Sequence, residues 1–351
     1  MIEIDGATLE GGGQLMRTAV ALAAVTKKPC RVFNIRKNRP KSGLMPQHLL
    51  GIQALAQLCK GRLEGDYLGS EEIKFYPSQN YRDRISINIP TAGSITLVLQ
   101  ALIPPALFVE KPIKISFDGG ATDTFFSPTI DHFRYAFLRI LEKMEGKIEV
   151  NILRRGYYPE GGAKVEVTVF SPNLKNLNLI ERGSLKKILV ISGASNALKN
   201  KKVAERQIAG VREILGKLKL PIEEEIEYYD TRCPGSQICL VAEFENTVIG
   251  TDNLGKLGKR AEDVGKEAAL ELLKEQKTGA CLDEHLADQI LPFLALSNKK
   301  CSVTVSEITN HCKTNIWVIE KLAQYRNEIS DTGFLKGKFQ INGNLITWLP
   351  S

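Results

Sequence analysis

Three consecutive glycines, residues 11–13, lie between Glu10 and Gln14 and lead into an apolar helical pattern that carries Arg17. Glycine has no Cβ, so a phosphate can approach the backbone amides closely at such a turn. A helix that begins here directs its unpaired N–H groups and the positive end of its dipole to the same place. Glu10 could hold a divalent cation, and the Arg17 guanidinium could hold a phosphate. The segment equally fits a plain strand-to-helix turn, because its spacing matches neither common nucleotide-binding motif.

The densest group of basic residues lies between positions 31 and 41, shortly before two further polar residues. Together these are Arg31, Arg36, Lys37, Arg39, Lys41, Gln47 and His48. Guanidinium groups suit terminal phosphates, which carry two or more charges and accept bidentate hydrogen bonds. A run of charges is also common in a solvated loop, so the spacing alone leaves both interpretations open.

The composition is that of a globular enzyme. The chain has 351 residues, which favours roughly two domains, and 43% of them are apolar, which is enough for packed cores. It contains neither an apolar run long enough for a membrane span nor a secretory start, so we expect no membrane association. Seven cysteines without a CxxC pair argue against a disulfide framework or a zinc finger and predict a cytoplasmic location. The net charge of +7 is a mild indication of a polyanionic partner.

An internal repeat organises the chain. Lys28 and Lys111 each precede a proline and a predicted strand. His48 and His132 each lie at the start of a predicted helix, and the interval between them is nearly the same. Each unit is predicted to run β-α-β-α-β-β, which is a sheet with two helices on one face.

The pattern divides the chain into three units and one insertion. The first two units span about residues 1–80 and 81–175, and a third copy is readable in residues 278–351. Residues 183–277 interrupt the series with a β-α-β-β-α pattern of their own. The sequence therefore predicts a mixed α/β (α+β) fold with a large domain, residues 1–182 and 278–351, and a smaller inserted α/β domain, residues 183–277.

Six segments carry a resemblance to a known family. In chain order they read DGATLEGGGQLMR, IRKNRPKSGLMPQH, TAGSITLVLQ, RRGYYPEGG, EHLADQ and HCKTNI. With this order and spacing, the chain resembles the RNA 3′-terminal phosphate cyclase family from end to end. The resemblance implies three repeats similar to the C-terminal domain of translation initiation factor 3, with a smaller α/β domain inserted before the third.

The resemblance also implies a reaction. Enzymes of the family are ATP-dependent ligases that form a covalent histidine–AMP, release pyrophosphate, and transfer AMP to the 3′-phosphate of an RNA end. The neighbouring 2′-hydroxyl then displaces AMP and leaves a 2′,3′-cyclic phosphate, a step that needs little beyond positioning because both groups share one ribose. The implied ligands are ATP, RNA with a 3′-terminal phosphate, and Mg²⁺ or Mn²⁺, and a homodimer is a possible assembly.

The resemblance assigns the adenylated histidine to His311, which precedes Thr314 and Asn315 at the start of a predicted helix. A helix N-terminus disfavours an imidazolium, so we expect the ring to keep a lone pair near neutral pH. A histidine in this place can also be a capping or packing residue, and His48 and His132 occupy the equivalent places in the other units.

A second group of residues is implied to bind ATP. Its members are Gln100, Pro128, His285, Leu286, Ala287, Asp288 and Gln289. His285 would stack on the adenine, where the family usually has a larger aromatic residue, and Pro128 would pack on the other side of the base. A metal cluster around His285 is not expected, because Asp283 lies two positions away and therefore faces another side of the predicted helix.

The remaining implied contacts concern phosphate and RNA. The residues assigned to the triphosphate and the RNA end are Arg17, Arg36, Arg39, Gln47 and His48. Glu10 would hold the divalent cation. Tyr157 and Tyr158 could stack on bases, although aromatic residues in strands usually belong to the core. Basic residues of the insertion that could extend the RNA path are Lys199, Lys201, Lys202 and Arg206.

Two functions of other classes stay open. A noncatalytic relative could serve as a scaffold in ribosome assembly, but such relatives lack the catalytic histidine, whereas this chain has His311 and Glu10. A small-molecule transferase of the enolpyruvyl type repeats a similar α/β unit, but it is built from six units, and this chain has room for three.

Overall fold

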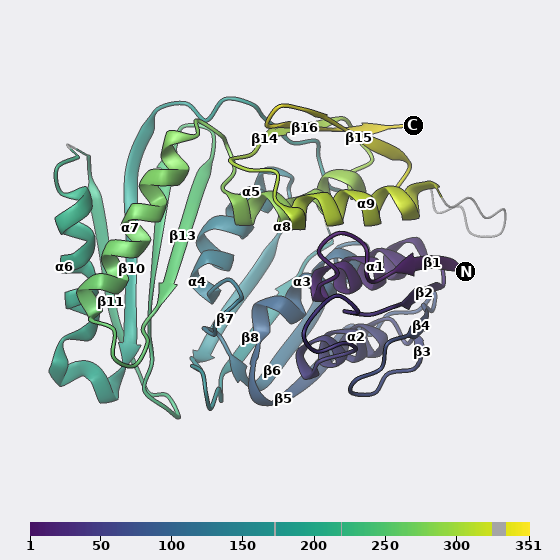
Figure 1. Cartoon of the computed structure of the whole chain (residues 1–351), viewed down its shortest axis with the longest axis horizontal. Helices are drawn as coiled ribbons and strands as arrows, with labels where there is room; N and C mark the ends of the chain where they lie inside the picture. The colour runs from purple at the N-terminus through teal and green to yellow at the C-terminus, as the bar shows by residue number, and fades with distance from the viewer. Residues whose placement is uncertain (172, 219, 325–334) are drawn as a thin grey trace.

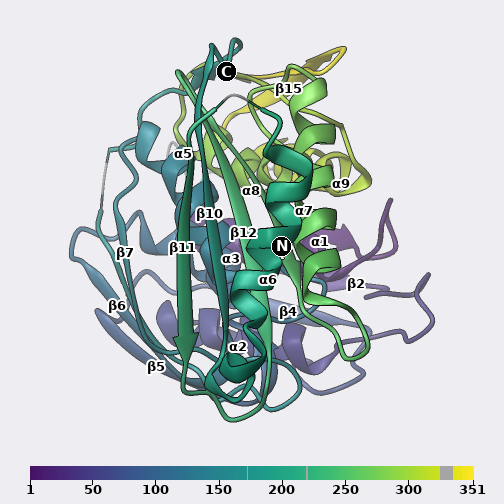
Figure 2. The ribbon, with the colours of Figure 1, turned by 90° about the vertical axis from the view of Figure 1, so that its left-hand side faces the viewer.

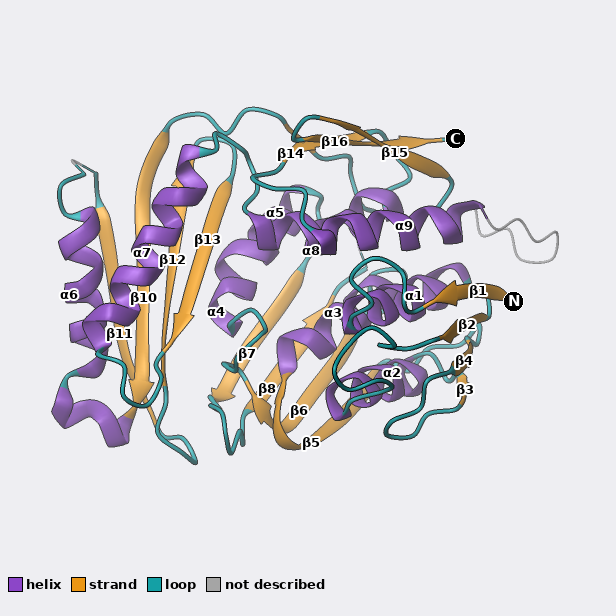
Figure 3. Cartoon of the chain, viewed as in Figure 1, coloured by secondary structure: helices purple, strands orange, loops and turns teal. Residues whose placement is uncertain are grey.

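The structure is a computed structural model that describes residues 1–171, 173–218, 220–324 and 335–351. The strands of this part of the chain form four four-stranded sheets, with helices packed between and beside them (Figure 1). Helices and strands alternate through most of the sequence (Figure 3), so the mixed α/β class predicted from the sequence is confirmed. The likeness of the units to the translation-factor domain and the division into domains stay predictions.

Residues 1–80 form one sheet with two helices. The elements are β1 (Ile2–Asp5), α1 (Gly13–Thr26), β2 (Cys30–Phe33), α2 (Pro46–Leu58), β3 (Arg62–Glu64) and β4 (Ile73–Tyr76). The strand order is β1-β2-β4-β3, and β1 runs parallel to β2 while the other two pairs are antiparallel. Ile2 and Ile4 are both buried because side chains two apart on a strand point to the same face.

The second sheet repeats this connectivity. Its elements are β5 (Arg84–Ser94), α3 (Ile95–Ala106), β6 (Ile113–Ala121), the consecutive helical segments α4 (Ile130–His132), η1 (Phe133–Phe137) and α5 (Leu138–Lys143), β7 (Ile148–Arg154) and β8 (Lys164–Val169). The strand order is β5-β6-β8-β7, again with one parallel pair followed by two antiparallel pairs. The side chain of Ser94 caps α3 by accepting a hydrogen bond from the Leu97 N–H.

A third sheet of the same connectivity closes the chain, but its first strand comes from before the insertion. Its elements are β9 (Asn178–Leu179), α8 (Glu284–Leu296), β14 (Cys301–Thr304), α9 (Asn310–Gln324), β15 (Gly337–Asn342) and β16 (Leu345–Pro350). The short strand β9 pairs in parallel with β14, where Asn178 lies opposite Ser302. The sequence pattern did not predict this first strand. It lies before the insertion, outside residues 278–351, and a strand of two residues is too short to show a periodicity. The sequence also predicts a strand FLKGKFQI in this unit, and its first residue, Phe334, lies outside the described residues.

The fourth sheet lies within the inserted segment. Its elements are β10 (Leu185–Ser195), η2 (Asn196–Lys201), α6 (Val203–Leu215), β11 (Ile222–Tyr229), β12 (Ser236–Phe244), β13 (Val248–Leu254) and α7 (Ala261–Lys277). The strand order is β11-β10-β12-β13. The sequence pattern missed β13, so the predicted β-α-β-β-α order of the insertion was incomplete.

The sheet of the insertion is covered on both faces. Helices α6 and α7 lie over one face (Figure 2), where Ile188 and Val190 of β10 belong to a hydrophobic cluster with Leu272 of α7. The alternate residues Leu189 and Ile191 belong instead to the large cluster that joins the other three sheets. Successive side chains of β10 point to opposite faces of the sheet, so they pack alternately into two hydrophobic clusters. No described helix combines the length and the apolar character that a membrane crossing requires.

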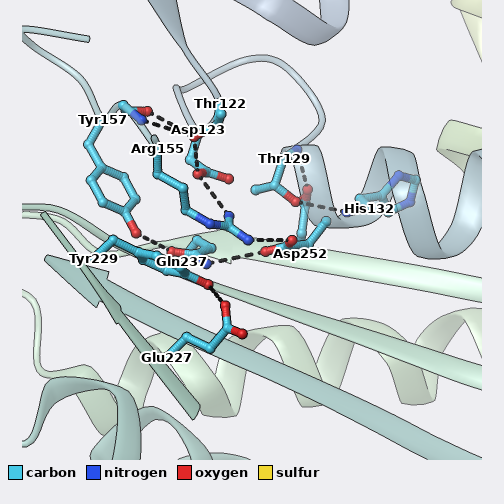
Figure 4. Close-up of polar contacts among 12 residues, drawn as sticks. Thr122, Asp123, Thr129, His132, Arg155, Tyr157, Glu227, Tyr229, Gln237 and Asp252 are labelled. Atoms are coloured by element: carbon cyan, nitrogen blue, oxygen red, sulfur yellow. Dashed lines mark hydrogen bonds and ion pairs between the residues drawn. The ribbon is translucent and has the colours of Figure 1, made fainter. Parts of the chain in front are cut away.

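A buried ionic network joins the second sheet to the insertion (Figure 4). The Arg155 guanidinium donates to Asp123 Oδ2 at 3.2 Å and to Asp131 Oδ1 at 2.6 Å. Gln237 of β12 donates from Nε2 to Asp131 Oδ2 at 3.2 Å and accepts a hydrogen bond from the Tyr157 hydroxyl. These side chains are all almost completely buried, so water does not screen their interactions. The network therefore holds the second sheet and the insertion in one arrangement.

Candidate active site

His311 lies in a cluster of polar side chains where α9 meets the glycine turn before α1. Its Nδ1 contacts Oε2 of Glu10 and the side-chain oxygen of Gln14. The other carboxylate oxygen of Glu10 contacts the Arg39 guanidinium. These contacts fix the orientation of the imidazole through Nδ1, which leaves Nε2 as the nitrogen that can act as a nucleophile.

The surroundings of His311 shift its pKa in the direction opposite to the one that a helix start favours. The hydrogen bond and the charge of Glu10 raise the pKa of His311, although partial burial acts in the opposite direction. Burial would raise the pKa of Glu10, but the contacts with His311 and Arg39 prevail and lower it. In the ligand-free protein the contact with Glu10 therefore acts against the helix start, which favours the neutral ring. A full carboxylate charge in direct contact outweighs the partial charge of a helix terminus.

We expect Glu10→Gln to lower the pKa of His311 in metal-free protein, because an amide does not favour the imidazolium. The neutral ring should then persist to lower pH than in the wild type. An NMR titration of the imidazole in the presence of a chelator measures the shift, and His285 is an internal control because Glu10 does not affect its pKa. Identical His311 titration curves in the two proteins would contradict the assigned contact.

The three glycines allow side chains to approach the backbone closely. A Cβ at Gly13 would lie 2.1 Å from Nε2 of His48, and a Cβ at Gly12 would lie 2.9 Å from Oε1 of Glu10. Gly11 has a φ of +59°, which is in the left-handed region that favours glycine. The side chains of His48 and Glu10 therefore lie against the glycine turn, at the place where the sequence predicts a phosphate. A phosphate at this turn stays a prediction.

Hydrogen bonds between side chains hold α1, α8 and α9 together at the site. Gln14 donates from Nε2 to Asp288 Oδ2 at 2.7 Å, and Asn315 donates from Nδ2 to the Asp288 carbonyl at 2.7 Å. Thr18 donates to Oδ1 of Asn315 at 2.7 Å. Gln14 and Asn315 were not among the predicted site residues. Their spacing could have indicated them, because Gln14 lies one helical turn before Arg17 and Asn315 one turn after His311.

Arg17 lies behind this cluster and is partly buried, with its Nε fully covered. One terminal nitrogen of its guanidinium donates to Oε1 of Gln100 at 3.3 Å. Burial lowers the pKa of Arg17 to about 10, although the charges of Asp288 and Glu10 oppose the change. Its Nε has no hydrogen-bond partner among the described residues. A buried donor without a partner is costly, so the site retains capacity for an anionic ligand.

Arg17 and several predicted ATP-binding residues line one small cavity. Its polar lining includes Gln100, Asp288 and Gln289, and its apolar lining includes Phe293. The cavity has a volume of about 30 Å³, whereas pockets that bury small ligands measure about 300–1,000 Å³. The structure thus brings these predicted residues together, but a nucleotide base can enter only if side chains move apart. Burial raises the pKa of Asp288 to about 6.

Other predicted ATP-binding residues lie around this cavity in different ways. The side chain of His285 is 62% exposed, and its ring centroid lies 6.4 Å from that of His132. The carbonyl of Pro128 accepts a hydrogen bond from Thr96 at 2.8 Å, one turn before Gln100 on α3. The side chains of Leu286 and Ala287 are fully buried in the core. Any contact of these two residues with ATP must therefore come from their backbone.

The predicted phosphate-binding residues on the basic segment divide into separate groups. His48 is buried against the glycine turn, and burial with the charges of Arg17 and Arg36 lowers its pKa to about 3. The amide of Gln47 accepts from the Ser94 N–H at 2.7 Å and donates to the Ser94 carbonyl at 3.0 Å. Gln47 thus links α2 to the end of β5, and the structure directs its amide toward this joint.

Some of the other charged and aromatic side chains singled out in the sequence already interact with neighbouring protein groups. Arg31 pairs with Glu3 and Glu72 and so stabilises the first sheet. Arg36 donates from Nε to the Lys41 carbonyl at 3.3 Å. Tyr157 is buried in the ionic network, as is typical of a core residue, whereas Tyr158 is exposed beside Phe125.

Helix α6 of the insertion lies at the opposite side of the view from α1 and α9, which carry Arg17 and His311 (Figure 1). Arg206 forms a bidentate ion pair with Glu262. The ammonium of Lys199 lies over the ring of Tyr228 at 5.8 Å. Asp283 caps α8 and accepts a hydrogen bond from the Gly250 N–H at 3.0 Å, so it serves the structure and does not join His285 in a metal cluster.

Comparison with known proteins decides the family. A model of the family described as RNA 3′-terminal phosphate cyclase matches residues 8–329. The chain belongs to this family. The predicted family and the prediction of a ligase-type enzyme are both confirmed.

Several curated relatives cover nearly the whole chain. The RNA 3′-terminal phosphate cyclase of Pyrococcus abyssi is 44% identical over 96% of this chain and 98% of its own length. That of Thermococcus kodakarensis is 44% identical over 95% of this chain and 97% of its own length. That of Hyperthermus butylicus is 41% identical over the full length of both chains. These relatives support an RNA cyclase function and give no support to an enolpyruvyl transferase.

Proposed function

We propose that this enzyme uses ATP to convert the 3′-terminal phosphate of RNA to a 2′,3′-cyclic phosphate through a covalent His311–AMP. The observation that supports this most directly is the imidazole held through Nδ1 by Glu10 and Gln14, with Nε2 left for chemistry. Arg17 and Arg39 place two guanidinium groups around the same cluster. Attack on a triphosphate needs a neutral imidazole nitrogen that is held in a fixed orientation. It also needs cationic groups nearby that offset the charge of the phosphates.

In the first step the Nε2 lone pair of His311 attacks the α-phosphorus, and pyrophosphate leaves with the electrons of the broken P–O bond. Nδ1 keeps its proton and donates a hydrogen bond to Glu10 or Gln14. This hydrogen bond stabilises the positive charge on the substituted ring. The 3′-phosphate of RNA then takes AMP from Nε2. In the last step the 2′-hydroxyl attacks the activated phosphorus and AMP leaves, so the ring closes within one ribose.

Glu10 is the residue that would hold Mg²⁺ or Mn²⁺. A lone carboxylate suits such an ion, because Mg²⁺ in nucleotide sites takes one or two carboxylates together with substrate phosphates. In the ligand-free protein the carboxylate of Glu10 pairs with Arg39 and His311, so a divalent ion would take the place of one of these cationic groups. A divalent ion there would neutralise part of the charge of the triphosphate. Because the ion and an imidazolium compete for one carboxylate, its presence also favours the neutral form of His311.

The division of the chain supports the same proposal. We assign residues 1–182 and 278–351 to a large catalytic domain and residues 183–277 to an inserted domain. The first three sheets share one strand order and the fourth has another, which is what three related units and an insertion require. A cytoplasmic location agrees with the seven cysteines, which are free and buried. A homodimer stays a prediction.

The test of this function uses α-labelled ATP and an RNA oligonucleotide with a 3′-phosphate. The labelled protein should carry AMP in an acid-labile bond before RNA is added. After RNA is added, the label should leave the protein, and the terminal phosphate should become resistant to phosphatase. Labelled protein that never yields phosphatase-resistant RNA would overturn the cyclase function and leave only the adenylation.

Arg36 and Arg39 should separate two steps of the reaction. Arg39 contacts Glu10 beside His311, whereas the contact of Arg36 is with the Lys41 carbonyl. We expect Arg36→Ala to spare adduct formation and to slow AMP transfer by about one to two decades, because a charge-assisted contact contributes roughly 1.5–3 kcal/mol. Arg39→Ala should slow both steps. Single-turnover transfer from preformed protein–AMP measures the difference.

Oligonucleotide length is the control for this pair of variants. If Arg36 only attracts the RNA backbone, its loss should depend on oligonucleotide length and salt concentration. An equal loss in adduct formation and transfer for Arg36→Ala would place this residue on the ATP triphosphate, and its assignment to the RNA end would be wrong.

A further inference from the structure

Three carboxylates meet where α7 ends and α8 begins. Each of Glu271, Glu275 and Glu284 offers a carboxylate oxygen, and these three atoms lie within 4.8 Å of one another. Glu271 and Glu275 share a face of α7 because they are four residues apart, and Glu284 is the first residue of α8. The turn between the two helices therefore brings the third carboxylate to the other two.

The central carboxylate of this group is buried without a counter-charge of its own. Glu275 is only 3% exposed, and its Oε2 makes no hydrogen bond of normal geometry among the described residues, although the Ser306 hydroxyl lies close to the carboxylate. The carboxylates of Glu271 and Glu284 lie beside it. A buried carboxylate in such surroundings is costly unless a proton or a cation neutralises it.

The cationic side chains nearby serve the outer two glutamates. Lys274 lies 2.9 Å from Glu271 Oε1, and its side chain is 61% exposed. His285 lies 3.7 Å from Glu284 Oε1, and its side chain is 62% exposed. Exposed pairs of this kind contribute little free energy. The inner side of the cluster, toward Glu275, thus keeps an excess of negative charge.

We propose that Glu271, Glu275 and Glu284 bind a divalent cation of the oxygen-preferring class, such as Ca²⁺ or Mg²⁺. Three carboxylates with oxygens this close can share one ion, whose remaining ligands would be water on the half-exposed side of Glu271 and Glu284. The site is separate from Glu10, which lies on the glycine turn before α1. It does not depend on the proposed adenylation chemistry.

The position of this cation site suggests its effect on the fold. Helix α7 is the last element of the inserted segment, and α8 carries His285 and Asp288 of the predicted ATP site. The Arg182 guanidinium, which lies just before the insertion, donates to the Gln276 carbonyl at 2.6 Å in the same region. A bound ion would therefore fasten the start of α8 to the point where the chain leaves the insertion (Figure 1).

The experiment is a titration of the full-length, nucleotide-free protein with Ca²⁺ and with Mg²⁺ after treatment with a chelator. Calorimetry measures binding, and thermal unfolding with and without the ion provides a second measurement. We expect one ion per chain and a rise in melting temperature in the wild type. The Glu271→Gln, Glu284→Gln double variant should bind at least tenfold more weakly and lose that rise. The single Glu284→Gln variant serves if the double variant does not fold.

Two matched variants make the outcome decisive. Glu142→Gln removes an exposed glutamate from α5, and Glu10→Gln removes the predicted catalytic ligand. Both should keep the wild-type binding of the ion in the nucleotide-free protein, because Glu10 is expected to hold its own ion only together with the phosphates of ATP. Loss of binding in Glu10→Gln would assign the ion to the active site and overturn the proposal. Equal binding in the wild type and the double variant, or no uptake by the wild type at millimolar concentrations, would overturn it as well.

Discussion

His311→Ala protein is expected to form no covalent adduct with AMP. The alanine removes the only ring nitrogen that the contacts of Glu10 and Gln14 orient for attack. Loss of a catalytic nucleophile typically reduces the rate by about a thousandfold or more. The side chain of His311 is half-exposed and lies in the first turn of α9, so its loss should not disturb the core. Incubation with α-labelled ATP, followed by denaturing electrophoresis, measures the adduct.

The control for this result is His285→Ala. His285 is the other exposed histidine near the predicted nucleotide site, and it should affect the affinity for ATP and not the ability to form the bond. A circular dichroism spectrum equal to that of the wild type shows that both variants are folded. A normal adduct in His311→Ala, together with none in His285→Ala, would move the nucleophile to α8 and refute the assignment.

Arg155→Met is expected to destabilise the protein by about 3–5 kcal/mol, because it leaves two buried carboxylates without their cation. Asp123 and Asp131 both contact the Arg155 guanidinium, and all three side chains are almost completely buried (Figure 4). Burial and the charge of Asp131 already raise the pKa of Asp123 to about 6, despite the opposing charge of Arg155. Methionine fills much of the same volume, so the loss reflects charge more than packing.

The pH dependence of this loss follows from the sign of the pKa shifts. Without Arg155 the pKa of Asp123 should rise further above its value in the unfolded state, because Arg155 is the charge that lowers it. A buried carboxyl group with a raised pKa is protonated and uncharged at low pH. As the pH rises through that pKa the group ionises, and the cost of burying its charge lowers the free energy of unfolding. The difference in free energy of unfolding between Arg155→Met and the wild type should therefore grow from acid to neutral pH. Urea unfolding at several pH values measures it.

Arg139→Met is the matched control for this prediction. Arg139 of α5 pairs with Glu243 of β12 at 3.5 Å, so it also joins the second unit to the insertion, but its side chain is 45% exposed. An exposed pair contributes at most about 1 kcal/mol. Equal destabilisation by the two variants would mean that burial of the Arg155 network adds nothing, and the account given for it would fail.

The local pattern of the sequence predicted most elements and placed His311 at the start of a helix, while its role as the nucleophile stays a prediction from the family resemblance. Alternating apolar residues mark β1, a continuous apolar run marks β10, and the glycines of residues 11–13 mark the start of α1. The position of His311 at the start of a late helix was also readable. These features are encoded within a few residues, because strand and helix periods and turn residues act over short distances along the chain.

Only the tertiary structure decided what those residues contact. The hydrogen bond from Gln14 to Asp288 joins residues 274 positions apart, and β9 is recognised as a strand only by its pairing with β14. The proton affinity of His311 likewise follows from the distant Glu10 and not from its own helix. Hydrogen bonds, burial and charge depend on which surfaces pack together. Packing is a property of the whole chain, so a period read from a few residues can place a side chain on a face but cannot name its partner.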